Sequence, residues 1–179
     1  MDPKEDVWLE PDPLWTDRYE TERERVEEAS DDGLLGVFHV GSTAIPDVPG
    51  KPTLDVIAVY EDYGSMRAAA EALAEGDHVI EADDEDEESM VVIDWGDEEA
   101  VFVKMHTRDD VKVRNQLVFR DYLRENEDAR REYERVKREA VEEHGDDHHA
   151  YTKAKTDLVM SIIERAHDEG YDDRVPEFA

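Results

Sequence analysis

The residue types best suited to chemistry gather in one short segment, residues 39–55. Gly41 follows an apolar stretch, and a glycine there lets the backbone turn sharply and approach a ligand closely. Ser42 and Thr43 then offer two hydroxyls beside backbone N–H groups, and Lys51 adds a positive charge. Because N–H groups at the start of a helical turn carry partial positive charge, the segment predicts a site for phosphate or another anion.

An acid lies inside an apolar run directly after this segment. Asp55 belongs to LDVIAVY, residues 54–60, where a carboxylate is costly to bury unless it is paired or coordinated. Two interpretations stay open. Asp55 either accepts hydrogen bonds from the Ser42–Thr43 loop and locks it, or it binds a metal ion or contacts a ligand.

Two further candidates lie on a later predicted strand. Alternation places Lys104 and His106 on one face with Phe102. A protonated lysine is a poor metal ligand, so Lys104 favours an anion pocket over a transition-metal site. His106 is either a ligand or proton acceptor of the site, or a hydrogen-bonded histidine at a strand end.

The helical second half of the chain adds a third group of candidates. Arg120 and Arg124 share a helix face and either pair with surface acids or converge on a phosphate. Tyr151 and Lys155 are also four residues apart; the tyrosine either stacks on a base or packs in the core. His39, which opens the first segment, completes the predicted ligand-binding set.

The charge balance makes each of these cations informative. The chain of 179 residues has 51 acidic and 21 basic side chains and a net charge of −30, and its acids are spread over the whole length. A disordered acidic chain, a basic partner and adaptation to a salt-rich cytoplasm all explain such a charge. Regular helix and strand patterns argue against disorder, and molar salt screens carboxylate repulsion, so halophilic adaptation is favoured. The net charge disfavours nucleic-acid binding outside a local pocket.

Several classes of protein are excluded by what the chain lacks. It has no cysteine, which excludes disulfides, cysteine zinc sites and thiol catalysis. No apolar run approaches the roughly 20 residues that span a bilayer, and the first residues do not resemble a signal peptide. We therefore expect a cytoplasmic protein without a membrane partner, folded as one domain over residues 1–179.

The predicted elements place these candidates on an α+β fold. The N-terminal half predicts a mixed sheet with covering helices, and the C-terminal half predicts helices packed against it. The predicted helices cover 17–30, 66–74, 115–125, 128–143 and 149–167; the predicted strands cover 37–40, 54–60, 90–95 and 100–106, with a long loop at 41–53 and an acidic turn at 83–88.

Several strings together resemble one family. GSTAIP and KPTLD in residues 41–55, FRDYLR at 119–124, and Tyr-x-x-x-Lys at 133–137 and 151–155 are similar to the GrpB family, over about residues 15–166. The resemblance implies a nucleotidyltransferase-like fold of the polymerase-β type, in which a Gly-Ser turn holds nucleotide phosphates and acids on the next strand bind magnesium. Asp55 would then be a magnesium ligand. Ile57 stands where a second acid is usual, which argues against ordinary two-metal transfer.

Three functions follow as hypotheses. The favoured one is a nucleotidyltransferase-like protein that binds a nucleotide or another phosphorylated small molecule, with at most one magnesium ion. The second is an active nucleotidyltransferase in which Asp55 binds the metal and His106 acts as ligand or proton acceptor. The third is a folding helper or interaction module without catalysis.

Overall fold

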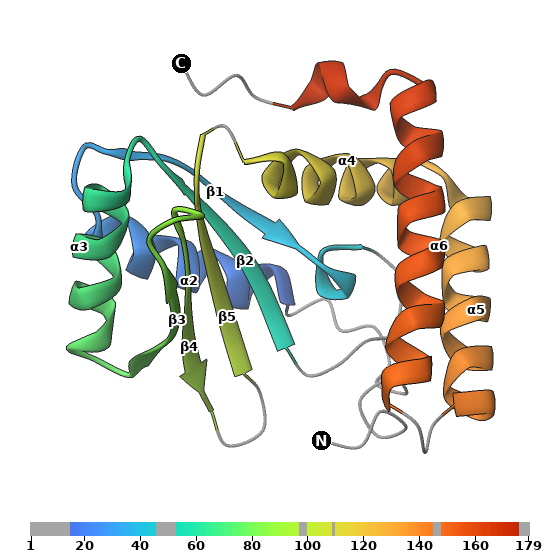
Figure 1. Cartoon of the computed structure of the whole chain (residues 1–179), viewed down its shortest axis with the longest axis horizontal. Coiled ribbons are helices and arrows are strands. Elements are labelled where there is room, and N and C mark those ends of the chain that lie inside the picture. Colours follow the sequence, from blue (N-terminus) through green and yellow to red (C-terminus); the bar gives the residue numbers. More distant parts are fainter. Residues whose placement is uncertain (1–14, 46–52, 97–99, 109, 145–147, 176–179) are drawn as a thin grey trace.

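The computed structural model describes residues 15–45, 53–96, 100–108, 110–144 and 148–175. Its centre is a five-stranded sheet in the order β1-β2-β5-β4-β3 (Figure 1). The central strands β2 and β5 run parallel and the other neighbours run antiparallel. The predicted mixed sheet is therefore confirmed. Its strands are β1 (Leu34–Val40), β2 (Thr53–Tyr60), β3 (His78–Asp84), β4 (Ser89–Trp95) and β5 (Ala100–Thr107).

Two helices cover one face of this sheet: α2 (Trp15–Ala29) and α3 (Tyr63–Ala74). They share with alternate strand residues an apolar core that includes Val26, Val56, Met66 and Val103. Asp62 caps α3, because its side chain accepts a hydrogen bond from the Ser65 N–H. Burial of this apolar face supplies most of the force that holds α2 and α3 on the sheet.

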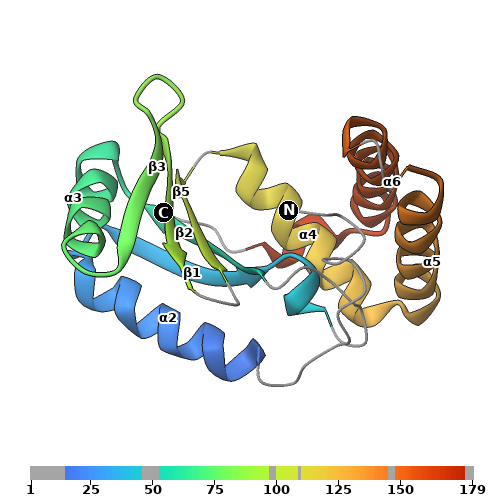
Figure 2. The ribbon, with the colours of Figure 1, turned by 90° about the horizontal axis from the view of Figure 1, so that it is seen from below.

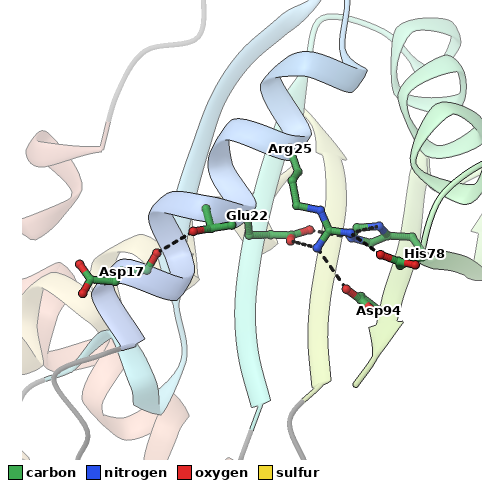
Figure 3. A network of polar contacts seen from close by, with 7 residues as sticks. Asp17, Glu22, Arg25, His78 and Asp94 are labelled. Atoms are coloured by element: carbon green, nitrogen blue, oxygen red, sulfur yellow. Dashed lines mark hydrogen bonds and ion pairs between the residues drawn. The ribbon is translucent and has the colours of Figure 1, made fainter. Parts of the chain in front are cut away.

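A buried polar network also joins α2 to the sheet (Figure 3). Glu22 on α2 lies 2.7 Å from Nε2 of His78 on β3. Arg25 lies 3.0 Å from Glu22 and 3.1 Å from Asp94 of β4. Glu22 and His78 are almost fully buried, so their polar atoms depend on each other and on Arg25 for hydrogen bonds.

The opposite face of the sheet meets α4 (Val111–Glu125), which packs Val113 and Leu117 against Ile57 and Val59. The other side of α4 packs against α5 (Glu127–His144), α6 (His148–Asp168) and the short helix η2 (Tyr171–Arg174), in a second apolar core. Figure 2 shows α4 lying between the sheet and the α5–α6 pair. The predicted α+β class and the helical C-terminal half are thus confirmed.

The observed elements differ from the predicted ones in a few places. Strand β3 was not predicted, and Asp83 and Asp84 belong to it, so the acidic turn is shorter than expected. A short 3-10 helix, η1 (Ser42–Ala44), interrupts the predicted long loop. Among the described residues, no helix is both long enough and apolar enough to cross a membrane.

Candidate functional site

A cavity of about 540 Å³ lies where the α4-side face of the sheet meets the three C-terminal helices. Its volume falls within the range of small-molecule sites. The sheet supplies one wall and the helices supply the other. The described lining residues are Val40, Gly41, Thr53, Asp55, Trp95, Phe102, Lys104, Gln116, Phe119, Tyr133, Lys137, Lys155 and Val159.

Gly41 and Asp55 fit tightly together at the edge of this cavity. In the antiparallel register Val40 pairs with Asp55, so the turn after β1 begins directly beside the carboxylate. Gly41 has φ of +76°, and a Cβ on it would lie 2.6 Å from Asp55 Oδ2. Both the backbone angle and the available space therefore require glycine here.

Substitution of Gly41 tests this packing, and Gly170 provides a matched control. Gly170 has φ of +82°, but a Cβ there would have no atom within 4 Å. We expect Gly170→Ala to lower the free energy of unfolding by about 1 kcal/mol, the cost of the backbone angle alone. Gly41→Ala should cost about 1–3 kcal/mol more, because the carboxylate must also move. Urea unfolding of both variants measures the difference; equal losses would contradict the tight fit.

Positively charged side chains line both walls of the cavity that contains Asp55. On the sheet, Lys104 Nζ lies 3.9 Å from Asp55 Oδ1. On α5, Lys137 is only 2% exposed and its ammonium lies 5.6 Å from the centre of the Tyr133 ring. On α6, the partly buried Lys155 faces the same cavity. The structure therefore brings Asp55, Lys104 and Lys155 to one cavity, and Lys137 also lines it.

The two predicted arginines contact the chain itself. Arg120 Nη1 donates to the carbonyl of His39, and Arg124 Nε donates to the carbonyl of Ala44. Arg120 also pairs with Asp121 at 2.9 Å. Both arginines thus hold the end of β1 and η1 in place, and neither is among the described lining of the cavity. Their geometry favours support of the loop over direct contact with an anion.

His39 also helps to hold the end of β1 and η1 in place. Its Nε2 lies 2.8 Å from the hydroxyl of Thr43, and its ring stacks on Tyr19 with centroids 4.9 Å apart. Burial, and then the charges of Arg124 and Arg120, lower the pKa of His39 to about 4. His39 is therefore neutral at pH 7 and fixes the first turn of η1 through Thr43.

His106 lies away from Asp55. The parallel register pairs Asp55 with Phe102, and His106 follows Phe102 by four residues, or roughly 13 Å along the strand. His106 Nδ1 lies 2.7 Å from Asp110, the residue that caps α4 through the Lys112 N–H. Burial lowers the pKa of His106, while Asp110 opposes that shift. The structure places Phe102, and diagonally Lys104, where His106 was expected.

Three predicted site groups lie outside what the structure describes. Lys51 falls within residues 46–52, and the side chains of Ser42 and Tyr151 are likewise outside the described set. The backbone of Ser42 begins η1. Their proposed contacts with a ligand stay predictions.

Comparison with known proteins identifies the family. The model of the family described as "GrpB protein" matches residues 7–165. The chain belongs to the GrpB family. A UPF0157 protein of Streptomyces coelicolor is 31% identical over 155 residues, which cover 87% of this chain and 81% of that protein. A UPF0157 protein of Deinococcus radiodurans is 30% identical over 162 residues, covering 88% and 81%.

A solved GrpB structure has the same fold. The crystal structure of the conserved protein GrpB from Enterococcus faecalis superposes with a TM-score of 0.79, covering 90% of this chain and 97% of that one, at 21% sequence identity. The two proteins therefore share a fold.

The GrpB chain does not fit the magnesium centre that the nucleotidyltransferase resemblance implies. Ile57, at the position of the usual second acid, is buried in the core against Val113 and Leu117. A charged neighbour of Asp55 is the cation Lys104. Within the described ranges, no group of three or more histidines, aspartates or glutamates is placed to hold a metal ion. Asp55 is thus better suited to orienting a lysine than to binding a cation.

Several residues that line the cavity were not predicted from the sequence. Lys137 was noted only within a family string, because a lysine near the middle of a charged helix has no distinctive pattern. Trp95 and Phe102 were assigned to a hairpin without a role. Gln116 and Val159 had no sequence signal at all, since only the packing of α4 and α6 brings them to the cavity.

Proposed function

We propose that this GrpB-family chain binds a nucleotide or another phosphorylated small molecule in the cavity between the sheet and the C-terminal helices. One observation supports the proposal: three of the chain's seven lysines line a single cavity in a protein of net charge −30. Lys104, Lys137 and Lys155 come from three different elements, so neither helix spacing nor strand alternation alone brings them together. A local cluster of cations in an anionic molecule indicates an anionic ligand.

The charges of the described lining support the same assignment. The formal charges of the three lysines and of the Asp55 carboxylate sum to +2. Lys137 is buried, and its ammonium lies 5.6 Å from the centre of the Tyr133 ring. A phosphate oxygen entering the cavity would add a charge-assisted hydrogen bond in a setting shielded from water.

We propose binding without nucleotidyl transfer. Transfer through two metal ions needs several carboxylates around them, and the side chains near Asp55 do not fit that requirement. Incubation with nucleoside triphosphates and magnesium in molar potassium chloride should therefore release no pyrophosphate. Release above the background of an Asp55→Asn variant would instead support the transferase alternative.

Thermal unfolding with a panel of nucleotides, sugar phosphates and inorganic phosphate tests the binding itself, in molar potassium chloride. A ligand at 100 times its Kd stabilises the folded state by about 2.7 kcal/mol, so the unfolding temperature should rise. Lys155→Gln should weaken that ligand roughly tenfold, because a hydrogen bond to a charged group is lost.

Lys153→Gln is the matched control for this experiment. Lys153 lies two residues from Lys155 on α6, is exposed and does not line the cavity. Lys153→Gln removes the same charge as Lys155→Gln and should leave the affinity for the ligand nearly unchanged. Equal weakening by both variants would show a general charge effect, and absence of any shift across the panel would favour the non-catalytic interaction module.

A further inference from the structure

An exposed tryptophan forms part of the rim of the cavity. Trp95 ends β4 and is 54% exposed, and it lies edge-on to Phe102 with ring centroids 5.6 Å apart. Single exposed apolar residues are common and need no explanation. Trp95 differs because its ring is supported by a second aromatic side chain and both rings line the cavity that holds the three lysines.

The register fixes how far Trp95 lies from Asp55, which pairs with Phe102. Trp95 pairs with Ala100 on β5, and Ala100 pairs with Thr53 on β2. Two strand spacings and two residues along β2 therefore separate Trp95 from Asp55, which is roughly 12 Å between backbone positions. A ligand that contacts both Trp95 and the Lys104–Asp55 pair needs a spacer of about the size of a sugar.

The lining of the cavity combines apolar and charged side chains. Phe119, Val159 and Val40 extend the apolar lining, whereas the lysines and Asp55 carry its charge. The sum of +2 complements a phosphate monoester, which carries about −1.5 to −2 at pH 7. A triphosphate would bring more negative charge than the described lining balances.

On the basis of the proposed function, we propose that the ligand is a nucleoside monophosphate or a close analogue, with its planar ring stacked on Trp95 and its phosphate held by Lys104, Lys137 and Lys155. Trp95 would then be a residue that determines ligand specificity. Aromatic stacking is tolerant of the base, so Trp95 selects for a flat ring and not for one particular base.

Calorimetry with matched probes in molar potassium chloride tests this inference. AMP carries both ring and phosphate, ribose 5-phosphate lacks the ring, adenosine lacks the phosphate, and ATP adds charge. We expect AMP to bind roughly tenfold or more tightly than ribose 5-phosphate, the effect of one stacked base. Trp95→Leu should reduce AMP affinity by the same factor and leave ribose 5-phosphate affinity unchanged, while Trp95→Phe should retain part of the preference.

Fluorescence gives an independent readout of contact. AMP should quench tryptophan emission in the natural protein, and this change should disappear in Trp95→Leu although Trp8 and Trp15 remain. Ribose 5-phosphate should leave the emission unchanged in both proteins.

The outcomes separate this inference from the proposed function. Equal affinity for AMP and ribose 5-phosphate, or equal weakening of both by Trp95→Leu, would overturn the role of Trp95 and leave the phosphate site standing. Much tighter binding of ATP than of AMP would overturn the monophosphate assignment alone. Failure of AMP, ribose 5-phosphate, ATP and inorganic phosphate to bind would overturn both proposals.

Discussion

Replacing Glu22 with alanine is expected to lower the free energy of unfolding by about 3 kcal/mol, because it breaks a buried ionic network. Glu22 is 2% exposed and contacts both His78 and Arg25. Its removal leaves the Nε2–H of His78 without its acceptor in a buried place, and it removes one of the carboxylates that neutralise Arg25. Arg25 keeps its contact with Asp94, which limits the loss.

The hydrogen bonds of His78 define its state in the folded protein. Arg25 Nη2 donates to His78 Nδ1 at 3.3 Å, so Nδ1 accepts and Nε2 carries the hydrogen that Glu22 receives. Glu22→Gln keeps an oxygen that can accept this hydrogen but loses the negative charge opposite Arg25. We therefore expect Glu22→Gln to cost less than Glu22→Ala.

Urea unfolding in molar potassium chloride measures these losses, with Glu20→Ala as control. Glu20 lies on the same helix and pairs with Arg23, and both side chains of that pair are more than 40% exposed. Exposed pairs contribute little, so Glu20→Ala should change stability by less than about 1 kcal/mol. A Glu22→Ala variant no less stable than Glu20→Ala would show that the network does not stabilise the fold.

Acid is expected to destabilise the protein through His39, by up to about 3 kcal/mol between pH 6.5 and pH 4. The folded state lowers the pKa of His39 to about 4, whereas an unfolded histidine titrates near 6.5. Between these values the unfolded chain binds a proton that the folded chain does not. Stability from this source is therefore complete above pH 6.5, falls as the pH drops, and is lost below pH 4.

A His39→Gln variant isolates this contribution. The free energy of unfolding should be measured from pH 7.5 to pH 4 for both proteins, and the wild type should lose up to about 3 kcal/mol more than the variant. Contributions from the other ionisable groups are the same in both proteins and cancel in the comparison. Parallel curves would show that His39 is not held neutral by its burial and by the two arginines.

The sequence was informative about the fold wherever apolar periodicity was strong. The apolar run of β2 and the amphipathic pattern of α2 predicted their elements to within a few residues. Strand β3 was missed because it is an edge strand, mostly exposed and ending in acids. Such charges protect an edge from pairing with another chain, and they also hide the strand from pattern analysis.

The charged candidates of the site could be named from the sequence, whereas the groups that they contact could not. The scarcity of lysine in an acidic chain favoured Lys155, and the position of an acid inside an apolar run favoured Asp55; the structure brings both to the cavity. Arg120 and Arg124 were interpreted either as partners of surface acids or as ligands of a phosphate. They contact backbone carbonyls, a contact that residue type alone does not predict. Trp95 reaches the cavity through strand register, which a sequence without its fold does not reveal.

Helix α4 has apolar residues on both sides, and this has a mechanical consequence for the cavity. Leu117 packs toward the sheet, while Val118 and Leu123 pack toward α5 and α6. The distance between Lys104 and Lys155 therefore depends on how α4 packs between the sheet and the helices α5 and α6, although neither lysine lies on α4. We expect relatives with larger or smaller apolar residues around α4 to accommodate ligands of different size, even where every lysine of the cavity is the same.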